Sequence, residues 1–127
     1  WFEITETAAI ENLERTGTFI NVLRESGCQF CLDDFGAGMS SFSYLKQLPV
    51  QVIKVDGVFC RNMAQDTLDR AMVNSINEIG HVMGLKAVAE HIEDAAALEV
   101  ARELGMDYAQ GYHLHSPEPL DRLFPQP

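Results

Sequence analysis

The stretch from Phe30 to Ser41 joins an apolar run to two adjacent carboxylates, Asp33 and Asp34, and then to a loop with glycines at positions 36 and 38. Side chains along a strand alternate between its two faces. Neighbouring acids can therefore meet a common centre only where a strand ends and the backbone turns. Carboxylate oxygens are the ligands that hard divalent cations prefer. The stretch predicts a turn that can hold a divalent cation.

Polar side chains follow the other predicted strands in the same way. They are Glu3 and Glu6, Lys54 and Asp56, Glu90 and Glu93, and Gln110. The carboxyl ends of parallel strands carry the catalytic groups in β/α barrels and, more loosely, in open α/β sheets. Unpaired carboxylates in an apolar core are costly. So many acids at strand ends therefore indicate a metal-binding cluster.

The segments between these residues predict alternating strands and helices. We expect five strands, near residues 1–5, 28–33, 51–55, 85–90 and 106–110. We expect helices near residues 7–26, 67–83 and 94–104, which end at Gly27, Gly84 and Gly105. The repeated order of helix, glycine and strand indicates serial βα units with a parallel sheet, so the expected fold class is α/β.

Two side-chain patterns bear on the core. The segment 67–83 is the clearest helix, because an apolar stripe at three- and four-residue spacing is typical of a packed helix. That stripe consists of Leu68, Met72, Ile76, Ile79 and Met83. Cys28 and Cys31 are three residues apart, which on a strand places the two sulfurs on opposite faces. We therefore interpret them as core residues and not as a metal or redox pair.

Five motifs stand in register along the chain: Glu3-Ile4-Thr5-Glu6, Asp33 to Ser41, Ile53-Lys54-Val55-Asp56, Ala89-Glu90-His91-Ile92-Glu93 and Gln110-Gly111-Tyr112. In order and spacing they resemble the EAL family of bacterial cyclic di-GMP phosphodiesterases, which are β/α barrels. The resemblance runs from residue 1 to about 120, and it covers only the latter half of the family's domain. The family's Glu-Ala-Leu and Asn ligands belong to earlier strands, and no Glu-Ala-Leu occurs in the chain. The resemblance implies that residues 1–127 are a partial EAL domain with no second domain, the C-terminal half of a TIM-like barrel of about five strands with intervening helices.

The resemblance also implies a reaction and a role for each polar residue. The reaction is hydrolysis of cyclic di-GMP to linear pGpG at two Mg²⁺ or Mn²⁺ ions. The implied metal ligands are Glu3, Asp33, Asp34 and Glu90, with Asp33 between both ions. The implied catalytic residues are Lys54, Glu90 and Glu93, while Gln110 would bind substrate and Glu6 would anchor the loop 35–41. A salt bridge from Lys54 to Asp56 or Glu90, with no catalytic part, is the alternative for that residue.

Three positions depart from the family's pattern. Ala37 and Met39 stand where the family usually has Thr and Tyr, and His91 stands where it usually has Gly. The position of His91 suggests a positive φ, which residues with a side chain rarely adopt. These departures favour a second hypothesis, a degenerate EAL module that binds cyclic di-GMP or a protein partner without turnover. Another kind of metal-dependent α/β hydrolase would require the order of the motifs to be accidental.

Charge and length limit the partners. The chain has 9 basic and 19 acidic residues and a net charge of −10, which disfavours a nucleic acid polymer. A cyclic dinucleotide can still bind through metal ions that invert the local charge. No segment approaches the roughly 20 apolar residues of a membrane span, and no signal peptide is visible at Trp1, so we expect a cytoplasmic protein. Five strands cannot close a barrel, so we expect the chain alone to be inactive and to form a homo-oligomer through the open barrel edge.

Overall fold

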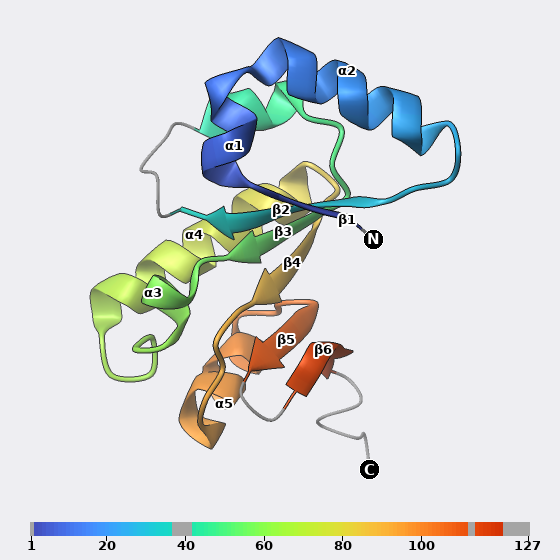
Figure 1. Cartoon of the computed structure of the whole chain (residues 1–127). Helices are drawn as coiled ribbons and strands as arrows, with labels where there is room; N and C mark the ends of the chain where they lie inside the picture. Colours follow the sequence, from blue (N-terminus) through green and yellow to red (C-terminus); the bar gives the residue numbers. More distant parts are fainter. Residues whose placement is uncertain (1, 37–41, 112–113, 121–127) are drawn as a thin grey trace.

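Six strands form one sheet in the computed structural model, which describes residues 2–36, 42–111 and 114–120. The strands follow one another across the sheet in chain order, with β1 and β6 at its edges (Figure 1). Their bounds are β1 Phe2–Thr5, β2 Phe30–Phe35, β3 Val52–Val55, β4 Lys86–Ala89, β5 Tyr108–Gly111 and β6 Leu114–Pro119. The first five strands pair in parallel, and β6 pairs with β5 in the antiparallel sense. The predicted α/β class with five parallel strands is confirmed, whereas β6 was not predicted.

Helical segments connect the parallel strands. They are α1 Glu6–Glu11, α2 Leu13–Arg24, the 3-10 helix η1 Phe42–Gln47, α3 Gly57–Cys60, α4 Thr67–Val82 and α5 Ala95–Glu103. Each of the five α-helices begins after a residue whose side chain accepts a hydrogen bond from a backbone N–H of the first turn, namely Thr5, Asn12, Asp56, Asp66 and Asp94. The predicted glycines after α2, α4 and α5 have the positive φ of helix ends: Gly27 at 87°, Gly84 at 80° and Gly105 at 76°. None of the helices in the described ranges is long and apolar enough to cross a membrane.

The prediction of one helix over 7–26 is wrong, because the helix is interrupted at Asn12. Its backbone leaves the helical region, with φ −153° and ψ 85°. Its side chain accepts a hydrogen bond from the N–H of Arg15 at 3.0 Å, so Asn12 ends α1 and begins α2. Asparagine competes for backbone N–H groups in this way, and apolar periodicity does not reveal it.

The sheet separates two groups of buried side chains. On one face, strand residues such as Leu32, Ile53 and Ala87 pack with side chains from the helices in the main core. On the other face, Cys31, Val52 and Val88 form a small cluster that only strands supply, with Tyr108 packed against it. We call this second face the inner face. Cys28 packs against the main core, so the prediction that Cys28 and Cys31 face opposite ways is confirmed.

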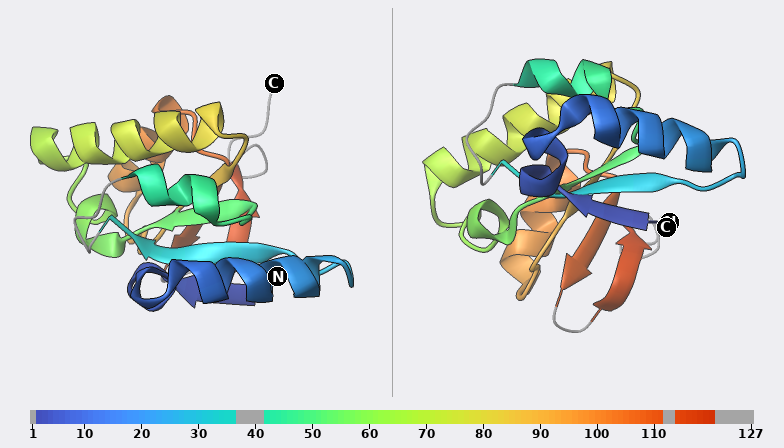
Figure 2. Two further views of the ribbon diagram at one scale, coloured as in Figure 1. Left: turned by 90° about the horizontal axis from the view of Figure 1, so that it is seen from above. Right: turned by 45° about the horizontal axis from the view of Figure 1, so that its top comes forward.

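The apolar stripe of α4 does not match the face that the helix buries. The sheet side of α4 consists of Val73, Ile76, Asn77 and Gly80. Leu68 and Met72, which the stripe pattern placed with the core, are 71% and 37% exposed. The helix lies across the sheet behind β3 and β4, as Figures 1 and 2 show. The stripe therefore predicted the helix correctly and its buried face only in part.

We expect alanine substitutions on α4 to separate these two faces. Ile76→Ala should lower the free energy of unfolding by about 2–5 kcal/mol, because it leaves a cavity at a side chain that is 1% exposed. Leu68→Ala should change it by less than about 0.5 kcal/mol, because that side chain is in solvent. Urea denaturation of the two variants measures both values. An equal loss of stability in Leu68→Ala would contradict the finding that Ile76 faces the core and Leu68 faces solvent.

Candidate metal centre

Polar side chains line the inner face at the carboxyl ends of the strands. Two residues beyond the apolar cluster, the same face carries Asp33 on β2, Lys54 on β3 and Glu90 directly after β4. Strand alternation places Glu3 of β1 and Gln110 of β5 on this face too. The parallel register brings the strand ends to one edge of the sheet, with Thr5 opposite Asp33 and Lys54 opposite Val88.

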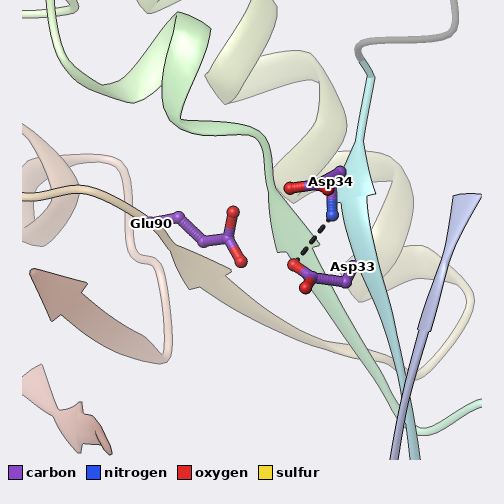
Figure 3. Close-up of side chains that lie close together, drawn as sticks. All are labelled: Asp33, Asp34 and Glu90. Carbon is purple, nitrogen blue, oxygen red and sulfur yellow. Dashed lines mark hydrogen bonds between the residues drawn. The ribbon is translucent and has the colours of Figure 1, made fainter. Parts of the chain in front are cut away.

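Asp33, Asp34 and Glu90 converge at this edge. One ligand oxygen from each lies within 4.8 Å of the others, and Figure 3 shows the three carboxyl groups turned toward a common space. Two adjacent acids can meet there because the pairing of β2 with β3 shifts register between Leu32 and Phe35, and Asp34 has φ 53°. The N–H of Asp34 also donates to Oδ1 of Asp33 at 2.9 Å. This bulge supplies the backbone turn that two adjacent ligands require.

The three carboxyl groups cannot all ionise easily so close together. Burial raises the pKa of Glu90 to about 9, and the hydrogen bond and charge of Asp33 and the charge of Asp34 act in the same direction. Burial opposes ionisation of Asp33 as well, but hydrogen bonds with Glu90 and the Asp34 N–H, and the charge of Lys54, hold its pKa below the ordinary value. Burial and the charges of Asp33 and Asp56 raise the pKa of Asp34. Without a metal ion, the three carboxyl groups therefore keep a proton on Glu90, in the space that a cation could occupy.

Lys54 is buried at 2% exposure and forms an ion pair with Glu3. Burial alone would lower the pKa of Lys54, but the hydrogen bond and charge of Glu3 raise it, so the amine stays protonated at neutral pH. The ion-pair partner of Lys54 is therefore Glu3, and not Asp56 or Glu90, the two partners considered from the sequence. Glu3 is 41% exposed at its side chain and lies outside the group of three carboxylates, although it is within hydrogen-bonding reach of Asp33.

Glu6 contacts the loop that follows β2. The carboxylate is 2% exposed, and it accepts hydrogen bonds from the N–H of Gly36 at 3.4 Å and from the hydroxyl of Tyr44. These contacts support the anchoring role that we expected for Glu6. Tyr44 was not among the predicted site residues, because no motif joins it to a residue 38 positions earlier. Ala37 and Met39, the two loop departures, lie outside the described residues.

Gln110 and Glu93 occupy different positions at the rim. Oε1 of Gln110 is buried and has no hydrogen-bond partner in the described part of the chain, so it is available to a ligand. Glu93 is exposed and is not in the carboxylate group. The donor set is composed of oxygens alone, which fits a hard divalent cation such as Mg²⁺, Mn²⁺ or Ca²⁺ better than a thiophilic metal.

Comparisons with known proteins agree on one family. The family model described as EAL domain matches residues 1–117. Cyclic di-GMP phosphodiesterase PdeB of Shewanella oneidensis is 44% identical over 119 residues, which are 94% of this chain and 14% of that protein. Cyclic di-GMP phosphodiesterase PdeF of Escherichia coli is 38% identical over 94% of this chain and 16% of its own length. The chain thus spans less than one fifth of the curated relatives it matches.

Solved structures show the same likeness. The PaMucR phosphodiesterase in complex with c-di-GMP has a TM-score of 0.82 and 36% identity, over 96% of this chain and 49% of that one. A manganese and cyclic di-GMP complex of Klebsiella pneumoniae BlrP1 has a TM-score of 0.82 and 30% identity, over 91% of this chain and 29% of that one. The sheet therefore corresponds to part of a TIM-like barrel, as the sequence predicted.

We expect the protonated Glu90 to give metal-free protein a pH-dependent stability. In the folded state Glu90 keeps its proton up to about pH 9, whereas in the unfolded chain it loses the proton near its ordinary pKa of 4.5. Between these values the folded state binds the extra proton, so the free energy of unfolding falls as the pH rises. Glu90→Gln should flatten this decline, because its amide does not titrate.

Urea denaturation in EDTA at several pH values between about 5 and 9 measures the decline. Glu93→Gln is the matched control, because it removes an exposed acid three positions away and should keep the wild-type slope. Equal slopes in Glu90→Gln and the wild type would mean that Glu90 does not hold the proton.

Proposed function

The chain belongs to the EAL domain family, and from this premise we propose that it forms the second half of a domain that hydrolyses cyclic di-GMP to linear pGpG. The observation that carries the proposal is the convergence of Asp33, Asp34 and Glu90 within 4.8 Å at the strand ends. Relatives named as cyclic di-GMP phosphodiesterases support the substrate and the reaction. We also propose that the whole protein works in the cytoplasm.

In this proposal the carboxylates hold two Mg²⁺ or Mn²⁺ ions, and a solved relative with manganese and cyclic di-GMP supports the metal. Asp33 lies between Asp34 and Glu90 in the hydrogen-bond pattern and has the lowered pKa, which suits a ligand shared by both ions. Glu3 would join the metal ligands on the side of Asp33, with residues upstream of this chain completing the set. When bound, the ions activate water and neutralise charge on the phosphodiester in the transition state.

The remaining residues orient the reactants. Lys54 keeps its positive charge and is fixed by Glu3, so it acts as a hydrogen-bond donor that holds the attacking water or a phosphate oxygen, and not as a base. The free Oε1 of Gln110 accepts a hydrogen bond from substrate. Glu93 would complete the site beside Gln110 as a catalytic residue. Glu6 anchors the start of the loop through its hydrogen bond from the N–H of Gly36.

A second candidate function is binding of cyclic di-GMP, or of a protein partner, without turnover. The observation that favours it is His91, which has φ 54° directly after Glu90 where the family usually has glycine. A strained residue at this point can hold Glu90 where a metal ion still binds but a fraction of an ångström from the position that catalysis requires. Binding without cleavage by the full-length protein would establish this alternative.

We expect Asp33→Asn to lower Mg²⁺- or Mn²⁺-dependent cleavage of cyclic di-GMP by the full-length protein at least about 100-fold, because it removes the shared ligand. Chromatography of the linear product measures the rate. Glu11→Gln is the control, because that exposed acid at the end of α1 is far along the chain from the site. Unchanged cleavage in Asp33→Asn would exclude the proposed role.

We also propose that residues 1–127, prepared alone, are inactive and self-associate through the open edge at β1. Near this edge Phe2 and Phe19 both pack against Phe30 of β2, and each is 55% exposed. Unpaired strand amides and exposed apolar side chains favour association. Light scattering should detect dimers or larger species, and Phe19→Lys should shift the chain toward monomer. A monomeric wild-type chain at high concentration would contradict this.

A further inference from the structure

His91 has a backbone conformation that its side chain disfavours. Within the described residues, two non-glycine residues have a positive φ, Asp34 at 53° and His91 at 54°. In Asp34 this conformation directs a carboxylate into the metal centre. His91 follows Glu90 immediately and supplies no oxygen or nitrogen to the carboxylate group. A residue with a Cβ costs free energy in the left-handed region, so contacts in the folded chain offset that cost.

The side chain of His91 lies against Gly57. The strands β3 and β4 end in register, Val55 opposite Ala89, so Gly57 and His91 each lie two residues beyond a strand end. A Cβ at position 57 would lie 2.0 Å from Cδ2 of His91 and 2.6 Å from its Cγ. The imidazole therefore occupies the space in which another residue at position 57 would place its side chain. His91 as a whole is exposed, so its ring lies against Gly57 and still reaches solvent.

The other side of the same segment is equally close to a glycine. A Cβ at Gly111 would lie 1.8 Å from the carbonyl oxygen of Ile92. The N–H of Ile92 donates to the carbonyl of Gln110 at 2.9 Å. The segment from Glu90 to Ile92 is thus confined between Gly57 on one side and Gly111 on the other.

This confinement acts on Glu90. Glu90 is 6% exposed, and one of its carboxyl oxygens lies within 4.8 Å of Asp33 and Asp34, so a small movement of the strand end would take it out of reach of a shared cation. We propose that His91 is a positioning residue whose ring, lodged against Gly57, fixes the strand end so that Glu90 stays in place for a divalent cation. The inference rests on the proposed function, because it assumes that these carboxylates bind metal. It also explains why a histidine is tolerated at a position with φ 54°.

The test is Mn²⁺ affinity, measured by electron paramagnetic resonance of free Mn²⁺ with the full-length protein. His91→Gly removes the ring and relieves the backbone strain, so its melting temperature should be unchanged or higher. His91→Asn also removes the ring but retains a residue that adopts the left-handed conformation readily. Both variants should bind Mn²⁺ about 10-fold more weakly, the usual effect of losing a group that orients a ligand.

Gly57→Ala changes the same contact between Gly57 and the His91 ring, on the side that follows β3. Its new methyl group should displace the ring and weaken Mn²⁺ binding about as much as His91→Gly does. The double variant Gly57→Ala with His91→Gly should bind no more weakly than His91→Gly alone, because both changes remove one contact. A merely structural contact would lower the melting temperature and leave Mn²⁺ affinity unchanged.

The possible outcomes distinguish the role of His91 from metal binding at the site. If the wild type binds Mn²⁺ and His91→Gly and His91→Asn bind it equally well, His91 has no positioning role and the proposed metal centre stands. If the wild-type protein binds no Mn²⁺, the proposed function is wrong and the inference falls with it.

Discussion

The mutual repulsion of three carboxyl groups is the constraint on which the site depends. Asp33, Asp34 and Glu90 lie within 4.8 Å of one another, and repulsion between like charges at that distance is substantial even at a protein surface. The fold counters it with the ion pair of Lys54 and Glu3 on one side and with a proton on Glu90. Such a site favours a cation, because the cation replaces the proton on Glu90 and also relieves the repulsion between the carboxyl groups.

The alternation of side chains along the strands determines which groups surround the three carboxyl groups. Along β2, β3 and β4 one face carries apolar residues that pack beneath the helices, and the other carries Cys31, Val52 and Val88 followed by polar groups. The apolar layer excludes water from below the polar layer. Burial of Lys54 and Glu90 follows from this arrangement, and their altered pKa values follow from burial.

The sequence predicted what depends on local pattern. Strand alternation and the glycines after helices located the five parallel strands and the ends of α2, α4 and α5, and five motifs in register indicated the family. The prediction was wrong where a single side chain competes with the pattern, as Asn12 does within the expected helix 7–26. The buried face of α4 was only partly predicted, because an apolar stripe does not tell which of two apolar sides meets the sheet. Contacts across long sequence separations, such as Lys54 with Glu3, depend on the assembled sheet and leave no trace in local spacing.

The ion pair between Lys54 and Glu3 joins a central strand of the sheet to an edge strand. Lys54 lies on β3, which has a neighbour on each side, whereas Glu3 lies on β1, whose outer edge has no partner strand in the described part of the chain. Edge strands open in native-state fluctuations far more often than central ones. Each opening of β1 withdraws the negative charge that holds the Lys54 ammonium in place. In residues 1–127 by themselves, the charge balance of the site is therefore coupled to the opening of one short edge strand.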